Sequence, residues 1–254
     1  MKDKVIIVTG GSSGMGKAMA KRFAEAEAKV VITGRSLERL EVAKREIEQY
    51  TDQVLCIDMD VRDVERVEFM VNHTLEVFGK IDGLVNNAAG NFLCAAEDLS
   101  HNGWNSVIDI VLNGTWYCTQ AVGKSWIEHG QQGRIINMVA TYAWGAGAGV
   151  IHSASAKAGV LSMTRTLAVE WGSKYGITVN AIAPGPIDNT GGSGKLSLSE
   201  DAKRQTIESV PVGRMGQPEE IAGLAYFLMS KDANFINGAC MTIDGGQWLN
   251  QKPF

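Results

Sequence analysis

The stretch Val5–Gly16, Val-Ile-Ile-Val-Thr-Gly-Gly-Ser-Ser-Gly-Met-Gly, decides the fold. It begins with β-branched residues, which are typical of a buried strand, and it ends in glycines that permit a tight turn. The residues from about 14 to 25 then have the periodicity of a helix. A strand, a Gly-rich turn and a helix in this order begin a βαβ unit, in which the helix start presents free backbone N–H groups that favour a phosphate.

The same alternation of short apolar runs and helical segments continues along the chain. The predicted strands are Val5–Thr9, Lys29–Thr33, Val54–Ile57, Gly83–Asn86, Arg134–Met138, Thr178–Ile182 and Cys240–Ile243. The predicted helices cover about 14–25, 36–49, 63–78, 103–129, 152–174 and 218–230. Most strands lack polar alternation, which indicates a parallel sheet covered on both faces. The sequence therefore predicts an α/β fold over residues 1–254: a single doubly wound, Rossmann-like domain with a seven-stranded parallel sheet flanked by helices.

Composition excludes several classes of protein. The chain has 254 residues, 45% of them hydrophobic, so it can bury a core without disulfides or metal. Its net charge is −4 and its charges are interspersed, which argues against a nucleic-acid partner. The four cysteines and four histidines have no metal-ligand spacing, and no apolar run is long enough to span a membrane. We expect a cytoplasmic protein with neither a metal site nor a membrane partner.

The end of the second predicted strand bears on the choice of cofactor. In doubly wound sheets ligands bind at the carboxyl ends of the strands, and NAD enzymes place an acidic residue here to bind the adenosine ribose. This chain has Arg35 instead, followed by Ser36. A guanidinium can bind a 2′-phosphate through paired hydrogen bonds, so the sequence favours NADP(H). A solvated surface arginine is the alternative interpretation.

The spacing T-G-x-x-x-G-x-G over Thr9–Gly16 resembles that of the short-chain dehydrogenase/reductase family. Asp60-Val61, Asn86–Gly90 and Pro184–Ile187 are similar to further motifs of this family, in the same order. The cofactor-binding residues that the resemblance implies are Gly10, Ser12, Ser13, Gly14, Met15, Gly16, Arg35, Ser36, Asp60, Val61, Asn87, Ala89, Gly90, Lys157, Pro184, Gly185 and Ile187.

The helix after the fifth strand departs from the family pattern Y-x-x-x-K. Lys157 occupies the lysine position, but Ser153 stands where the tyrosine is usual. A serine hydroxyl is far less acidic than a phenol, so it is a poor proton donor to an alkoxide. Two interpretations follow: a cofactor-binding module without catalysis, or a reaction that needs a different geometry.

Within the family, this departure resembles the 2,4-dienoyl-CoA reductases. The matching stretches are Asn86–Phe92, Asp109–Thr115, Ser153–Val160, Glu170–Gly172 and Pro184–Ile187. The resemblance implies that Tyr142, in the loop after the fifth strand, and Asn91 are the hydrogen-bond donors of catalysis. It also implies that Ser153 positions Tyr142 or a water, that Lys157 binds the nicotinamide ribose and that Asn113 supports Lys157 through water. A packed aromatic side chain and a turn residue are the alternatives for Tyr142 and Asn91.

The activity implied is NADPH-dependent reduction of 2,4-dienoyl-CoA thioesters to 3-enoyl-CoA in the oxidation of unsaturated fatty acids. The resemblance places Arg62 and Lys195 against the CoA and Phe92 in the acyl pocket, and it implies a homotetramer with helices 103–129 and 152–174 at an interface. The polar, Gly-rich segment Asp188–Leu198 is expected to form a substrate loop. Two alternatives stay open: an NADP(H)-dependent oxidoreductase of 3-oxoacyl or sugar carbonyls, and a non-catalytic NADP(H)-binding module.

Overall fold

The computed structural model, which describes residues 1–188 and 200–250, confirms the predicted sheet. Its seven strands are β1 (Val5–Thr9), β2 (Lys29–Gly34), β3 (Val54–Asp58), β4 (Gly83–Asn86), β5 (Arg134–Met138), β6 (Thr178–Pro184) and β7 (Cys240–Ile243). All neighbours pair in parallel in the order β3-β2-β1-β4-β5-β6-β7. The order reverses between β1 and β4, and this is where doubly wound sheets bind dinucleotides.

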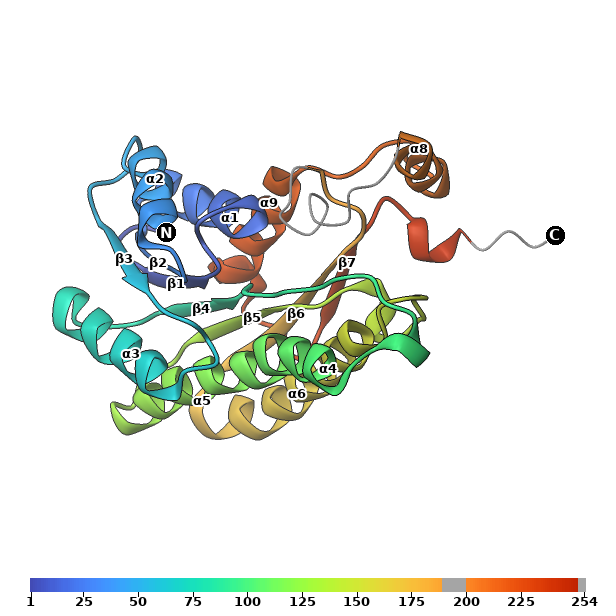
Figure 1. The fold of residues 1–254 in the computed structure, drawn as a ribbon. Coiled ribbons are helices and arrows are strands. Elements are labelled where there is room, and N and C mark those ends of the chain that lie inside the picture. Colours follow the sequence, from blue (N-terminus) through green and yellow to red (C-terminus); the bar gives the residue numbers. More distant parts are fainter. Residues whose placement is uncertain (189–199, 251–254) are drawn as a thin grey trace.

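Two layers of helices enclose the sheet (Figure 1). Helices α1 (Gly14–Glu25), α2 (Leu37–Ile47) and α9 (Pro218–Met229) cover one face, and α3 (Val64–Phe78), α5 (Gly114–Glu128) and α6 (Ile151–Tyr175) cover the other. An apolar core lies on each side of the strands, with fully buried Phe23 in one and Trp126 in the other. Because both faces are covered, the ends of the strands are the places left for a ligand.

The predicted helix over about 103–129 is confirmed, but its central part departs from α-helical geometry. This segment consists of α4 (His101–Ile108), a π-helical stretch over Asp109–Asn113 and α5. A π-helical insertion is a frequent mark of functional sites. Directly after it, a Cβ atom on Gly114 would lie 2.5 Å from a methyl carbon of Val61, so the glycine lets α5 begin against the loop after β3.

Several short elements complete the described chain. They are α8 (Glu200–Ser209), which the sequence analysis did not predict, and single turns over Ala96–Asp98, Thr141–Ala143, Lys231–Ala233 and Gln247–Leu249. Helix α8 buries none of its described residues, so it lacks the apolar stripe by which a helix is found in a sequence. In Figure 1 it lies beside the C-terminal segment, away from the two helix layers.

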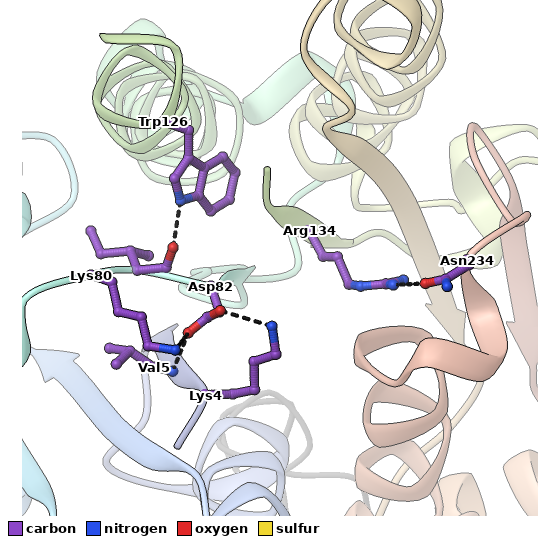
Figure 2. A network of polar contacts seen from close by, with 8 residues as sticks. Lys4, Val5, Lys80, Asp82, Trp126, Arg134 and Asn234 are labelled. Carbon is purple, nitrogen blue, oxygen red and sulfur yellow. Dashed lines mark hydrogen bonds and ion pairs between the residues drawn. The ribbon is translucent and has the colours of Figure 1, made fainter. Parts of the chain in front are cut away.

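Polar contacts close the amino-terminal edge of the sheet (Figure 2). The Asp82 carboxylate accepts hydrogen bonds from the Val5 amide and from Lys4, and it forms an ion pair with Lys80 at 3.0 Å. Burial would raise the pKa of Asp82, but these donors outweigh it and hold the pKa below its usual value. The buried indole of Trp126 donates to the carbonyl oxygen of Ile81 at 2.7 Å. These contacts secure the edge opposite to the expected ligand site.

None of the helices in the described ranges is long and apolar enough to cross a membrane. Across the same residues, no three His, Cys, Asp or Glu side chains gather as metal ligands would.

Candidate active site

The Gly-rich turn after β1 is built for close approach of a ligand to the backbone. Gly10 has a φ of +66°, which favours glycine, and a Cβ atom on Gly16 would lie 2.3 Å from the carbonyl oxygen of Gly10. The side chain of Ser13, which precedes α1, forms no capping hydrogen bond, so the first N–H groups of the helix stay available. This turn fits the pyrophosphate of a dinucleotide, because the helix start also carries partial positive charge.

Asn87 supports this turn from the neighbouring strand end. Its side-chain nitrogen donates to the carbonyl oxygens of Thr9 and Gly10 at 3.0 and 3.2 Å. The Thr9 hydroxyl in turn accepts hydrogen bonds from the backbone amides of Asn87 and Ala88, each at 3.0 Å. The Asn87 amide is therefore used to hold the turn in place.

The end of β2 presents Arg35 to solvent. The Ser12 hydroxyl lies 3.5 Å from where a Cβ atom of Gly34 would be, so the Gly-rich turn and the start of this loop are adjacent. Ser36 directly precedes α2 and caps it, because its hydroxyl accepts a hydrogen bond from the backbone amide of Arg39. A guanidinium and two hydroxyls thus stand at the edge where the sequence predicts a 2′-phosphate.

Asp60 and Arg62, after β3, are bound to each other. The Arg62 guanidinium donates to both carboxylate oxygens of Asp60 at 3.0 and 2.7 Å. This bond, with a smaller effect from nearby Arg35, lowers the pKa of Asp60, and the same bond raises the pKa of Arg62. Arg62, predicted to contact CoA, has its charge engaged by Asp60, next to Val61.

The predicted catalytic groups meet at the carboxyl end of β5. Tyr142, in a single turn after this strand, places its hydroxyl oxygen 3.1 Å from that of Ser153 on α6. Lys157 lies one helical turn after Ser153, and both side chains are buried. The Lys157 ammonium donates to the carbonyl oxygen of Met138 at 2.5 Å, and burial lowers the pKa of Lys157 to about 8. The structure therefore places a phenol beside the helix position where the family usually has one.

Two asparagines have their side chains oriented by local bonds. The Asn91 side-chain oxygen accepts a hydrogen bond from the Phe92 amide at 2.9 Å, which leaves its NH₂ group as the donor for a ligand. Asn113, the last residue of the π-helical stretch, donates instead to the Asp109 carboxylate at 2.9 Å.

The remaining predicted site residues lie after β4 and at the end of β6 or after it. Ala89 and Gly90 follow β4, and a Cβ atom on Gly90 would lie 3.4 Å from Ile110. Pro184 ends β6, and a Cβ atom on Gly185 would lie only 2.6 Å from the Cβ atom of Asp244, so the loops after β6 and β7 are in contact. Ile187 is buried and pairs with the segment after α8. Lys195, and the segment expected to form a substrate loop except for its first residue, Asp188, lie outside the described residues.

A buried polar network near the site escaped the sequence analysis. Asn137, the last residue but one of β5, accepts a hydrogen bond from Asn86 on β4 at 2.8 Å and donates to the Thr164 hydroxyl on α6 at 2.9 Å. Asn86 also donates to Thr119 on α5 at 2.8 Å. The signal was an asparagine inside the apolar run of β5. Because buried polar groups need partners, this network sets how α5 and α6 lie against the sheet.

Comparison with known proteins agrees with this geometry. The family model described as "Enoyl-(Acyl carrier protein) reductase" matches residues 10–247. A probable 2,4-dienoyl-CoA reductase of Bacillus subtilis, named as (2E)-enoyl-CoA-producing, is 61% identical over the full length of both chains. A probable 2,4-dienoyl-CoA reductase of Caenorhabditis elegans, named as (3E)-enoyl-CoA-producing, is 43% identical over 97% of this chain and 81% of its own.

A crystal structure of a short chain dehydrogenase from Bacillus anthracis superposes with a TM-score of 0.92, at 64% identity and over 99% of each chain. This chain combines the full-length similarity with a Gly-rich turn, a buried lysine on α6 and a doubly wound sheet order. The chain is an oxidoreductase with a nicotinamide cofactor site, and it belongs to the short-chain dehydrogenase/reductase family.

Proposed function

We propose that this protein reduces 2,4-dienoyl-CoA thioesters with NADPH. The observation that carries the proposal is the 3.1 Å contact between the hydroxyl oxygens of Tyr142 and Ser153. The acid of an ordinary carbonyl reductase is missing from α6, and a phenol from another loop stands next to its position. The names of the B. subtilis and C. elegans relatives support the same substrate class.

The chemistry suits hydrogen-bond donors better than a proton donor to an alkoxide. When bound, the nicotinamide supplies a hydride to the far carbon, C5, of the conjugated diene. Negative charge then develops on the thioester oxygen, where preorganised donors in a dry site stabilise it most strongly. The Tyr142 hydroxyl and the Asn91 NH₂ group are the donors that we assign to this oxygen.

Lys157 and Ser153 complete the arrangement. Ser153 orients the Tyr142 hydroxyl through a hydrogen bond, and their contact supports this role. Lys157 binds the nicotinamide ribose, and its ammonium places a positive charge near the developing anion. Asn113 donates to Asp109 within the π-helical stretch before α5, and this bond orients its side chain. We propose that Asn113 supports Lys157 from there through a bridging water.

The carbon that accepts the proton determines the product. Protonation at C2 leaves the 3-enoyl-CoA that the sequence resemblance predicts, and this is also the product class in the name of the C. elegans relative. Protonation at C4 leaves a 2-enoyl-CoA, the class in the name of the B. subtilis relative. NMR of the product formed in D₂O identifies the carbon that gains deuterium.

The test is NADPH consumption with a 2,4-dienoyl-CoA by the wild type, Tyr142→Phe and Ser153→Ala. Loss of one oxyanion donor lowers kcat by a factor of about 10²–10³, so the kcat of Tyr142→Phe should fall by this factor. The kcat of Ser153→Ala should fall by less. Tyr50→Phe, which changes a half-exposed tyrosine after α2, is the matched control. Full turnover in Tyr142→Phe would contradict the assignment. An alcohol product from 3-oxoacyl-CoA would instead support carbonyl reduction, and NADPH binding without any turnover would support a cofactor-binding module.

For the cofactor we propose NADP(H), because Arg35 and two hydroxyls, rather than a carboxylate, stand at the end of β2. Hydrogen bonds to charged groups contribute about 1.5–3 kcal/mol each, so Arg35→Ala should lower kcat/KM for NADPH by about 10- to 150-fold and leave NADH nearly unchanged. Arg39→Ala, on the exposed face of α2, is the control for loss of charge. Equal losses with both cofactors would contradict the proposal.

We also propose a cytoplasmic homotetramer whose subunits meet through α5 and α6. Val169 on α6 is 80% exposed, as an apolar residue at such an interface would be in a single subunit. Light scattering should give a mass near four times 27.3 kDa, and Val169→Glu should lower it. Cell fractionation with an enzymatic marker tests the location.

A further inference from the structure

Two tryptophans from distant parts of the chain meet beside the catalytic tyrosine. Trp144, in the loop after β5, and Trp248, in the segment after β7, have ring centroids 5.8 Å apart and planes at 87° to each other. Their side chains are 37% and 43% exposed, respectively. We call this pair the aromatic corner. An edge-to-face pair is a favourable aromatic contact, so the two rings hold each other in place while one part of each stays open.

The aromatic corner and the catalytic tyrosine share one turn of the chain. Tyr142 and Trp144 belong to one tight turn, closed by hydrogen bonds from the Trp144 and Gly145 amides to the carbonyl oxygen of Thr141 at 3.5 and 3.2 Å. The phenol that meets Ser153 and the indole that meets Trp248 are therefore separated by a single residue. The turn that positions Tyr142 therefore also positions one ring of the aromatic corner.

The other half of the corner is held from the protein side. The Trp248 amide donates to the Asp244 carboxylate at 2.8 Å, and the side chain of Gln247 donates to the Ser209 hydroxyl at the end of α8 at 2.8 Å. These contacts to the residue after β7 and to the end of α8 set the position of Trp248. Preorganised aromatic side chains provide binding area at low cost in conformational entropy.

The side chains next to the corner indicate what it binds. The nearest carboxylate in the segment, Asp244, has one oxygen bound to the Gly246 amide at 2.9 Å and the other to Trp248. Leu249 adds a 68% exposed aliphatic side chain next to the corner, and Phe92 exposes 38% of its surface on the loop that carries Asn91. Exposed aromatic and aliphatic side chains of this kind suit hydrocarbon.

We propose that the aromatic corner binds the acyl chain beyond its conjugated carbons and so sets the preference for chain length. This inference rests on the proposed function, because it assigns a position to part of the same thioester substrate. Each methylene that moves from water to the corner should raise kcat/KM by about fourfold, up to the length at which the chain passes the two rings.

The experiment measures kcat/KM for 2,4-dienoyl-CoA substrates of 6, 8, 10 and 12 carbons with the wild type, Trp248→Ala and Trp144→Ala. The kcat/KM of the wild type should rise by about fourfold per methylene over part of the series. In both variants kcat/KM should depend much less on chain length. Activity on the six-carbon substrate should stay within about threefold of the wild type, because that chain ends one carbon beyond the conjugated system. Phe235→Ala, which removes a fully exposed aromatic side chain before β7, is the control and should keep the slope.

Three outcomes overturn the inference and leave the proposed function standing. The first is an unchanged chain-length slope in Trp248→Ala. The second is an equal loss of kcat/KM at all chain lengths that disappears with pantetheine thioesters, because this result would mean that the rings bind the adenine of CoA. The third is an equal loss together with a lower mass in light scattering, because it would assign them to a subunit interface. Absence of turnover with every dienoyl-CoA in the wild type would instead overturn the proposed function.

Discussion

Replacement of Lys157 by methionine tests the electrostatics of the site through folding stability rather than activity. Burial lowers the pKa of Lys157 to about 8, against an ordinary value of 10.5. Between these values the unfolded chain keeps the proton on Lys157 and the folded protein releases it. Stability rises with pH wherever the unfolded state binds more protons, so the wild type should gain stability from Lys157 as the pH rises from about 8 to 10.5.

The size of the gain follows from the same two values. At about 1.4 kcal/mol for each pKa unit, the difference amounts to about 3 kcal/mol of unfolding free energy. At pH 7 Lys157→Met removes this cost of a buried charge but leaves the Met138 carbonyl oxygen without its donor, which costs about 1–3 kcal/mol. The two effects oppose each other at pH 7, so the change with pH is the quantity to measure.

The assay is urea unfolding at one protein concentration at pH 7, 8, 9, 10 and 10.5, for the wild type, Lys157→Met and Lys203→Met. Lys203 is exposed on α8, so its variant loses the same charge without the burial. The wild type should gain about 3 kcal/mol relative to Lys157→Met across the series and stay nearly constant relative to Lys203→Met. If the difference between wild type and Lys157→Met varied by less than about 1 kcal/mol, burial would not govern the charge of Lys157 and the reasoning would fail.

Three other substitutions test the cofactor turn and the amino-terminal edge of the sheet. Gly16→Ala should weaken NADPH binding in a fluorescence titration and lower the unfolding free energy by about 1–3 kcal/mol, because its methyl group overlaps the Gly10 carbonyl. Asp82→Asn should cost about 1–3 kcal/mol in urea unfolding at pH 7, and this difference should shrink below pH 3.8, where the carboxylate of the unfolded chain takes up a proton. Trp126→Phe should cost about 1–3 kcal/mol through the lost bond to Ile81 and leave kcat unchanged, since this edge is opposite to the site; a large fall in kcat would contradict that separation.

The elements that the sequence predicted correctly are those encoded in local patterns. The bounds of β1 and β4 and the range of α1 agree with the prediction, because runs of buried residues and a Gly-rich turn carry their signal within a few positions. Two features that lack such a local pattern, the π-helical stretch and α8, were not predicted from the sequence. The turn of π-helix at Asp109–Asn113 depends on how α5 meets the loop after β3, and α8 is too polar to show an apolar face.

The sequence by itself determined the alternation of strands and helices, the turn that receives a dinucleotide and the absence of a tyrosine four residues before Lys157. Only the tertiary structure decided that Tyr142 reaches Ser153 and that Trp144 meets Trp248. The physical reason is that periodicity along a chain encodes which side chains are buried, whereas contacts between loops depend on which strands are neighbours. The order β5-β6-β7 brings the loops after these strands to one edge, and no local pattern contains that order.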